Sequence, residues 1–180
     1  MSPTIKLPPP DIGDVKMKEL ILYLSRHSLS DPKFGVTKLN KLLFYCDFES
    51  YRRWSKTVTG KKYIHLAEGP VPHCMLPIRS QMIKAKILAI AVEEYYGFPQ
   101  ERTVALREPD VSIFSPKEID LFKEILETYK DYNATEISKK THLFAGFRIT
   151  SEKEPIDLKM ILIGDRLPTD KEIQHGLSLQ

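Results

Sequence analysis

Apolar residues recur at helical spacing soon after the start of the chain. Beyond Asp14, the residues Leu20, Ile21 and Leu24 fall on one side of a 3.6-residue repeat. The turn-forming run 30–32, Ser-Asp-Pro, ends this pattern. The spacing therefore predicts a first helix that is closed by this turn.

A second and wider apolar arc begins at Thr37, a good N-cap residue, and runs to about Trp54. Such a broad arc is typical of a central helix that packs on more than one side. Its apolar members are Leu39, Leu42, Leu43, Phe44, Cys46, Phe48, Tyr51 and Trp54. The opposite side of this helix is predicted to be polar, with Lys38, Lys41, Glu49 and Arg52.

Two polar residues, Asn40 and Asp47, interrupt the apolar arc and lie two helical turns apart. A carboxylate in such a place loses hydration, so hydrogen bonds or a positive charge must compensate for the loss. In one interpretation Asp47 is structural and accepts bonds from backbone N–H groups of a nearby loop or from a tyrosine hydroxyl. In the other, Asp47 lines a groove where a partner supplies the donors, and the sequence leaves both open.

Helix signals are missing from Ser55 to Pro77, where glycine and proline recur. Within this segment a short strand is predicted at 63–67, ending at a turn over 68–72. A third helix is predicted at about 78–95, and a second strand at 103–106.

Two capping boxes mark helix starts in the last third of the chain. Ser115 is followed by proline at the first helical position and by Glu118 at the third, and this helix keeps an apolar face to Tyr129. Asn133 and Glu136 repeat the pattern and start a shorter helix that ends near 141–142. Beyond them, 156–163 is predicted as a strand, and 169–172 as a third capping box.

Together these elements predict an α+β fold that is mostly α, a helical bundle with a small antiparallel sheet. The prolines near the start predict an extended arm over residues 1–13. The remainder, 14–180, shows no linker and is predicted to be a single domain.

The charges are unevenly spread, although the formal net charge of the 180 residues is only +3. Residues 38–62 hold seven bases against two acids, and residues 101–136 hold five bases against nine acids. This dipolar surface helps to orient a charged partner. The helix pair at 115–142 resembles a helix-turn-helix, which makes a DNA-binding regulator one alternative. Its net acidic region opposes a polyanion, so an ordinary αα-hairpin is favoured over nucleic-acid binding.

The sequence contains no recognisable metal-binding or phosphate-binding motif. The cysteines 46 and 74 and the histidines 65, 73 and 142 lack the paired short spacings of zinc sites, and no glycine-rich phosphate loop occurs. The sequence therefore predicts no metal, no cofactor and no catalysis. An enzyme of unrecognised type stays an alternative, and it would gather ionisable groups around Asp47, His65 or His73. No signal-peptide run or membrane span is recognised, so a cytoplasmic location is expected.

Several motifs together resemble the Panacea domain. They are Lys38-Leu-Asn-Lys-Leu-Leu-Phe-Tyr-Cys-Asp-Phe-Glu-Ser-Tyr51, Thr59-Gly-Lys-Lys-Tyr63, Glu68-Gly-Pro-Val-Pro72, Phe114–Phe122 and Asn133–His142. The resemblance spans about residues 14–150. It departs from the family after His142, where many members have a tryptophan and this chain reads Phe144-Ala-Gly-Phe147-Arg148.

The resemblance implies an antitoxin of a toxin–antitoxin pair that neutralises a toxin protein by direct contact. Some members of the family are thought to act as adaptors that hand the toxin to an ATP-dependent protease. The resemblance implies neither an enzymatic activity nor a cofactor.

The segment 55–77 is predicted to form a stiff loop beside the central helix, a preorganised surface for a partner. Exposed aromatic and arginine side chains are the usual anchors of such surfaces. The predicted partner-binding residues are Asp47, Tyr51, Arg52, Arg53, Trp54, Tyr63, Glu68, Gly69, Pro70 and Val71.

Overall fold

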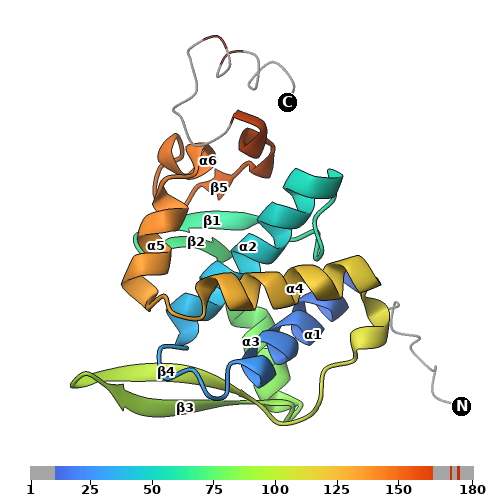
Figure 1. Ribbon diagram of the computed structural model, residues 1–180, viewed down its shortest axis with the longest axis vertical. Helices are drawn as coiled ribbons and strands as arrows, with labels where there is room; N and C mark the ends of the chain where they lie inside the picture. Colours follow the sequence, from blue (N-terminus) through green and yellow to red (C-terminus); the bar gives the residue numbers. More distant parts are fainter. Residues whose placement is uncertain (1–10, 164–170, 172–173, 175–180) are drawn as a thin grey trace, which may run out of the picture.

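A computed structural model describes residues 11–163, 171 and 174 (Figure 1). The capping box predicted at 169–172 lies outside the described residues except for Lys171, and so does most of the predicted proline-rich arm. The first helix starts at Ile12, earlier than expected, because the Asp11 carboxylate caps it by accepting from the backbone N–H of Gly13 (2.9 Å).

The predicted fold class, α+β and mostly α, is confirmed. The helices are α1 (Ile12–His27), α2 (Val36–Trp54), α3 (Met75–Lys84), α4 (Pro116–Tyr129), α5 (Ala134–His142) and α6 (Ala145–Arg148), with 3-10 turns η1 (Val111–Ile113) and η2 (Leu158–Ile163). The strands are β1 (Tyr63–Leu66), β2 (Gly69–Pro72), β3 (Leu88–Tyr95), β4 (Phe98–Ala105) and β5 (Pro155–Ile156).

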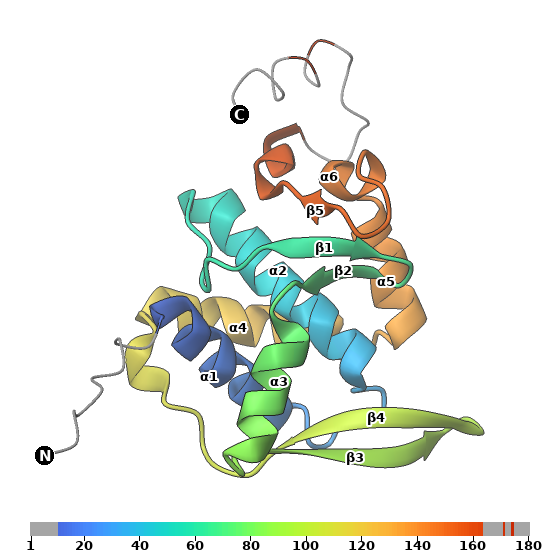
Figure 2. The same ribbon diagram turned by 180° about the vertical axis from the view of Figure 1, so that it is seen from behind.

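The described strands form two separate antiparallel sheets. One has the order β2-β1-β5, and the other is the hairpin β3-β4, which is paired along its full length from Leu88↔Ala105 to Tyr95↔Phe98. The hairpin lies beneath the helices, and its tip projects from the body of the molecule (Figures 1 and 2).

Helix α2 occupies the centre, as its broad apolar arc predicts. It contacts α1, α4, α5, β2, β4 and η2, and its apolar residues join one continuous core with α1 and α4. Figure 2 shows α2 running between the three-stranded sheet and the layer of α1 and α4. Every residue of this helix from Lys38 to Asp47 is therefore buried, and only its two ends reach water.

The predicted polar side of α2 is therefore wrong for two of its members, because Lys38 and Lys41 are only 1% and 0% exposed. The ammonium of Lys38 donates to Asp31 Oδ2 (2.7 Å) and to the carbonyl of Lys130, the C-cap residue of α4 (3.1 Å). That of Lys41 donates to the carbonyl of Pro70 in β2 (3.2 Å). These partners come from distant segments, which the periodicity of one helix does not reveal.

The helix predicted at 78–95 is wrong in its second half. Helix α3 ends at Lys84, a turn with Lys86 at a φ of +57° follows, and the chain continues as β3. A short apolar run such as 87–92 fits a strand as well as a helix, and its β-branched residues favour the strand. The strand predicted at 103–106 is the end of the longer β4.

Of the remaining predicted elements, some are confirmed and others are wrong. Both capping boxes, at Ser115 and Asn133, are confirmed with both reciprocal bonds present. The strand at 63–67 is confirmed as β1, whereas the turn predicted at 68–72 contains a second strand, β2. Only Pro155 and Ile156 pair as a strand, since most of the segment predicted at 156–163 forms η2.

We predict that Gly69→Ala destabilises the fold strongly. Gly69 has a φ of +105°, and an added Cβ would lie 2.6 Å from Thr141 Oγ1 and 2.8 Å from Lys41 Cε. Strain and crowding together should lower the free energy of unfolding in urea by about 2–4 kcal/mol. The control Gly60→Ala, at a φ of +68° with open space around it, should lose only about 1 kcal/mol. Equal losses would contradict this account.

Candidate functional site

Asp47 is fully buried and holds the loop after α2 against the helix. Its Oδ1 accepts from the backbone N–H of Thr59 (2.8 Å), and its Oδ2 accepts from the Thr59 hydroxyl. The Tyr63 hydroxyl lies 2.8 Å from the same Oδ2 and 2.9 Å from the carbonyl of Leu43. These contacts are those of the structural interpretation, with a loop N–H and a tyrosine hydroxyl as donors.

The electrostatics of this site follow from its burial. Burial raises the pKa of Asp47, whereas the hydrogen bonds from Thr59 and Tyr63 favour the charged carboxylate and oppose that rise. Burial also raises the pKa of Tyr63, so its hydroxyl keeps the proton that it shares with its two acceptors. Asp47 and Tyr63 thus support the loop from inside and present no surface to a partner in this conformation.

A second buried contact joins α2 to the strand β2. Gly69 and Pro70 are buried there, against the side chain of Lys41. Burial lowers the pKa of Lys41 to about 8, while the charge of Glu68 acts in the opposite direction. The Gly-Pro-Val-Pro run is therefore held against α2 by a lysine that is poorly solvated.

Four residues of the predicted site lie at the accessible C-terminal end of α2. Arg52 binds Glu49 through Nη2 (2.6 Å), and Arg53 Nη1 binds Glu124 of α4 (2.8 Å). The ammonium of Lys117 lies 4.5 Å from the centre of the Trp54 ring. The exposed Arg52 and Arg53, with the half-buried Tyr51 and Trp54, form what we call the α2-end surface.

The structure does not bring all the predicted partner-binding residues together. Asp47, Tyr63, Gly69 and Pro70 are internal, and only Glu68 and the half-buried Val71 of the β1–β2 hairpin reach the surface. The β1–β2 turn lies beside α5, at the end of β1 away from the α2-end surface (Figure 2). The predicted set therefore divides into an internal support and two separate pieces of surface.

Two of the histidines near these elements, His65 and His142, are engaged in packing. The His65 ring stacks on Phe147 at 3.7 Å, with its Nδ1 3.3 Å from Thr150 Oγ1, and His142 stacks on Phe147 at 4.5 Å. His73 is exposed beyond β2, and Asp47 is capped by Thr59. Among the described residues, these groups do not converge on a common point as the enzyme hypothesis requires. No group of three metal-ligating side chains occurs in the described part of the chain.

The helix pair α4–α5 packs against α2, and α5 buries Ile137 and Thr141. Lys139 and Lys140 are exposed on α5, with the ammonium of Lys140 5.2 Å from the centre of the Tyr132 ring. Exposed acids of α4, such as Glu127, lie in the same region of the chain. DNA binding by this pair stays a prediction that the acidic neighbours oppose.

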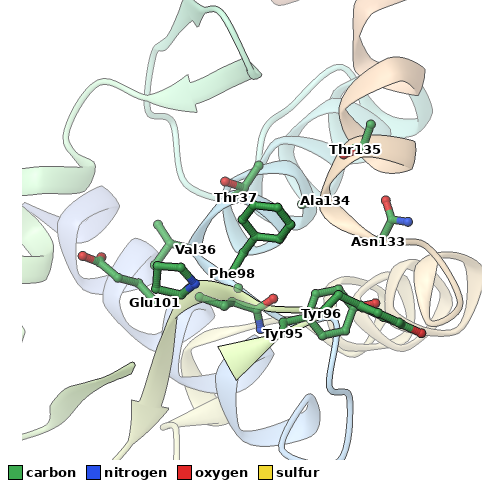
Figure 3. A pocket seen from close by; sticks show the side chains of 12 residues that line it. Val36, Thr37, Tyr95, Tyr96, Phe98, Glu101, Asn133, Ala134 and Thr135 are labelled. Atoms are coloured by element: carbon green, nitrogen blue, oxygen red, sulfur yellow. The ribbon is translucent and has the colours of Figure 1, made fainter. Parts of the chain in front are cut away.

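A groove that the sequence analysis missed lies between the tip of the β3–β4 hairpin and the first turns of α2 and α5 (Figure 3). Its volume is about 560 Å³, and Tyr95, Tyr96 and Phe98 line it on the hairpin side. The signal in the sequence is the glycine after two tyrosines, which marks a hairpin turn. Because residues 78–95 are predicted as one helix, the sequence analysis does not predict a hairpin turn there.

One of the comparisons with known proteins finds a match. The family model described as Antitoxin SocA-like, Panacea domain matches residues 39–146, from the first turns of α2 to the start of α6. The match covers more than half of the chain, so the protein belongs to the SocA-like Panacea-domain antitoxin family. No curated protein and no solved structure matches the chain. No described helix is long and apolar enough to cross a membrane.

We predict that Asp47→Ala lowers the free energy of unfolding by about 1–3 kcal/mol, because the buried donors of Thr59 and Tyr63 lose their acceptor. Chemical denaturation measures the change. Asp120→Ala, which removes an exposed carboxylate on α4, is the control and should change stability by less than about 0.5 kcal/mol. Unchanged melting together with lost partner binding would instead place Asp47 at an interface.

A second prediction concerns the pH dependence of stability. Because the pKa of Lys41 is about 8 in the fold and about 10.4 in an unfolded chain, the unfolded chain binds more protons between these values. The contribution of Lys41 to the free energy of unfolding should therefore rise with pH from 8 to 10, by up to about 3 kcal/mol. We expect the difference in stability between wild type and Lys41→Met to grow in favour of wild type over this range.

Urea unfolding at pH 7 to 10 measures this difference. Lys139→Met, which removes an exposed lysine of α5, should differ from wild type by a constant amount. A constant difference for Lys41→Met as well would show that Lys41 is not held at a lowered pKa.

Proposed function

We propose that this chain is an antitoxin that neutralises a cognate toxin protein by direct protein–protein contact. The observation that carries the proposal is the match of residues 39–146 to the SocA-like antitoxin domain. The geometry is compatible with it, because buried contacts hold the loop 55–63 in place and exposed side chains surround it.

The α2-end surface suits such a contact. Arg53 and Trp54 combine an aromatic face with a guanidinium, the types of side chain that dominate binding energy in protein interfaces. The ion pair of Arg53 with Glu124 and the position of Lys117 over Trp54 order these side chains before binding. Preordered side chains lose less conformational entropy when a partner binds.

Neutralisation can follow two routes once the toxin is held. In the first, the complex itself blocks the toxin. In the second, the antitoxin acts as an adaptor that delivers the toxin to an ATP-dependent protease. The amount of toxin distinguishes the routes, since it is maintained in the first and falls in the second.

Co-expression with the adjacent open reading frame tests the proposal. We expect growth that the neighbouring gene product arrests to be restored, and the two proteins to co-purify as a stable complex if the toxin is sequestered. Pulse-chase measurement of the toxin, in cells with and without the ATP-dependent proteases, reveals the adaptor route as a shortened half-life that depends on one protease.

Trp54→Ala tests the contact surface within the same assay, and we expect it to weaken binding by tenfold or more. Leu76→Ala, which truncates an exposed side chain of α3, is the control and should bind as wild type does. Failure of a folded, well-expressed wild-type chain to restore growth or to bind the neighbouring product would contradict the proposed function. Retention on plain DNA at physiological salt would favour the regulator instead.

A further inference from the structure

The outer edge of β3 is not paired with any strand in the described part of the chain. The sheet that contains it has only two strands, so β3 is an edge strand over all of its eight residues. Strand β4 contacts α1 and α2, and β3 is the strand that lies farther from these helices (Figures 1 and 2). A long edge strand presents a row of backbone groups to any further strand.

The register of the hairpin determines which backbone groups face outward. The N–H of Leu106 donates to the carbonyl of Ile87 (3.0 Å), and hydrogen-bonded pairs alternate with non-hydrogen-bonded pairs along an antiparallel ladder. The N–H and C=O groups of Ile90, Val92 and Glu94 therefore point away from β4. Within the described residues, no backbone hydrogen bond from a turn or loop reaches these three residues. They are available to another strand.

Two common protections of an edge strand, a bulge and a proline, are missing from β3. On β4, in contrast, Pro99 lies opposite Glu94 at a non-hydrogen-bonded position, so the outer edge of β4 lacks one N–H near the tip. The side chain of Val92, an apolar residue of β3, is 70% exposed. The open edge of this hairpin is therefore that of β3.

The charges along this edge favour a second copy of the same strand. The exposed Lys84 and Lys86 precede β3, and the exposed Glu93 and Glu94 lie near its end. Within the described residues, Lys84, Lys86 and Glu94 form no ion pair, and Glu93 lies 3.7 Å from Arg102. An antiparallel copy of β3 places the acidic end of each strand beside the basic start of the other. The edge is therefore complementary to itself.

One register satisfies both the backbone groups and the charges. When Ile90 lies opposite Ile90 of the second copy, Val92 lies opposite Leu88, and Glu94 lies opposite Lys86. The residues whose backbone groups face outward then meet each other, so the two strands can exchange hydrogen bonds. A two-fold axis at Ile90 relates the two copies, which is the symmetry of a closed dimer.

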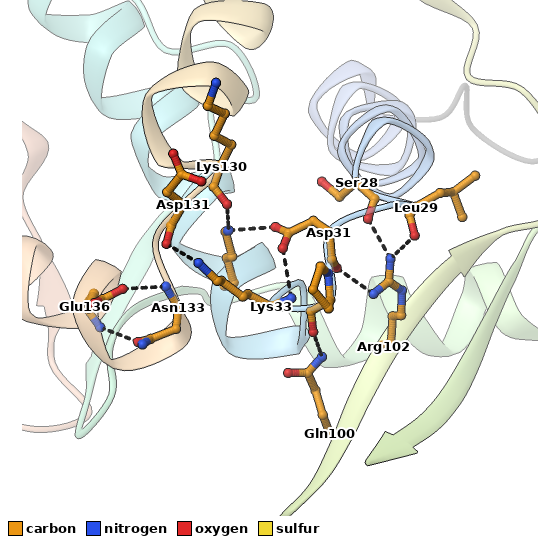
Figure 4. A network of polar contacts seen from close by, with 12 residues as sticks. Ser28, Leu29, Asp31, Lys33, Gln100, Arg102, Lys130, Asp131, Asn133 and Glu136 are labelled. Carbon is orange, nitrogen blue, oxygen red and sulfur yellow. Dashed lines mark hydrogen bonds and ion pairs between the residues drawn. The ribbon is translucent and has the colours of Figure 1, made fainter. Parts of the chain in front are cut away.

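The hairpin is anchored at its base and can present this edge in a fixed position. The guanidinium of Arg102 donates to the carbonyls of Ser28 and Leu29 (2.6 Å each) and of Asp31 (2.7 Å), at the end of α1 (Figure 4). The side-chain amide of Gln100 donates to the carbonyl of Pro32 (3.2 Å). A strand that is already ordered loses less conformational entropy when it pairs.

The tip of the hairpin is also held, although its turn is strained. Tyr96 and Gly97 connect the paired residues Tyr95 and Phe98, with φ values of +50° and +80°. Asparagine, aspartate and glycine are preferred in such a turn, so a tyrosine at its first position strains the backbone. Because the strands are paired up to this turn, β3 stays extended to its last residue.

We propose that two copies of this chain associate through the outer edges of β3. The two strands pair antiparallel around Ile90 and join the two hairpins into one sheet with the order β4-β3-β3-β4. The association requires no toxin, so this inference goes beyond the proposed function and does not rest on it.

Sedimentation velocity of the full chain, from micromolar to millimolar concentration, tests the pairing. We expect a monomer–dimer equilibrium in the wild type. Glu94→Lys places like charges opposite each other at both ends of the paired strands, so it should raise the dimer dissociation constant about tenfold at low salt and less at high salt. Adding Lys86→Glu to Glu94→Lys recreates opposite charges and should restore the dimer. Glu152→Lys, an exposed charge reversal outside the hairpin, is the matched control and should dimerise as wild type does.

A second variant tests the backbone contribution. Val92→Pro removes an N–H that faces outward and no hydrogen bond to β4, so it should leave the protein folded and monomeric. Circular dichroism verifies that the variant keeps the helix content of the wild type.

The outcomes separate this inference from the proposed function. A wild type that stays monomeric at the highest concentration overturns the inference, and so does a dimer that Glu94→Lys leaves unchanged. If a monomeric wild type binds the toxin and a folded Val92→Pro variant does not, the edge accepts a strand of the toxin and the assignment to a second copy is overturned. Because the sedimentation experiments contain no toxin, these results leave the proposed function standing.

Discussion

The enclosure of the middle of α2, from Lys38 to Asp47, is the constraint on which the rest of the structure depends. Polar groups along an enclosed helix cannot be hydrated, so each must find a partner or destabilise the fold. Lys38 reaches the ends of two other segments, Lys41 reaches β2, and Asp47 reaches the loop before β1. Each of these contacts ties a distant piece of chain to α2, so the polar groups of the helix determine where its neighbours lie.

This arrangement separates support from surface. The lysines and the aspartate of the Lys38–Tyr51 motif point into the protein, and so do Gly69 and Pro70 of the loop motif. The side chains that a partner could touch lie where α2 emerges at its two ends. Its last turn carries the α2-end surface, and its first turn forms one wall of the hairpin groove. Motifs that identify a family can therefore describe its framework rather than its contacts.

The parts of the fold that could be predicted from the sequence are those with local causes. Ser115 and Asn133 cap helices through bonds within four residues, and the donors of Asp47 follow from the cost of burying a carboxylate. The prediction that Lys38 and Lys41 are exposed is wrong, because their hydrogen-bond partners lie 7 to 92 residues away in the sequence. The groove could not be predicted, since it requires three segments to meet and the run before Tyr95 fits two periodicities.

The strained tip can persist because the rest of the hairpin overdetermines it. Eight consecutive residue pairs fix the register of β3 and β4. The Arg102 guanidinium also donates hydrogen bonds to three backbone carbonyls at the end of α1. A turn held at both ends in this way cannot relax its φ values without breaking strand pairs. The strand pairing and the contacts to α1 therefore offset the conformational strain at Tyr96. The anchoring depends on the α1–α2 connection, whose position depends in turn on Lys38. The same buried contacts that organise the core thus keep the exposed aromatic side chains at a fixed distance from the first turn of α2.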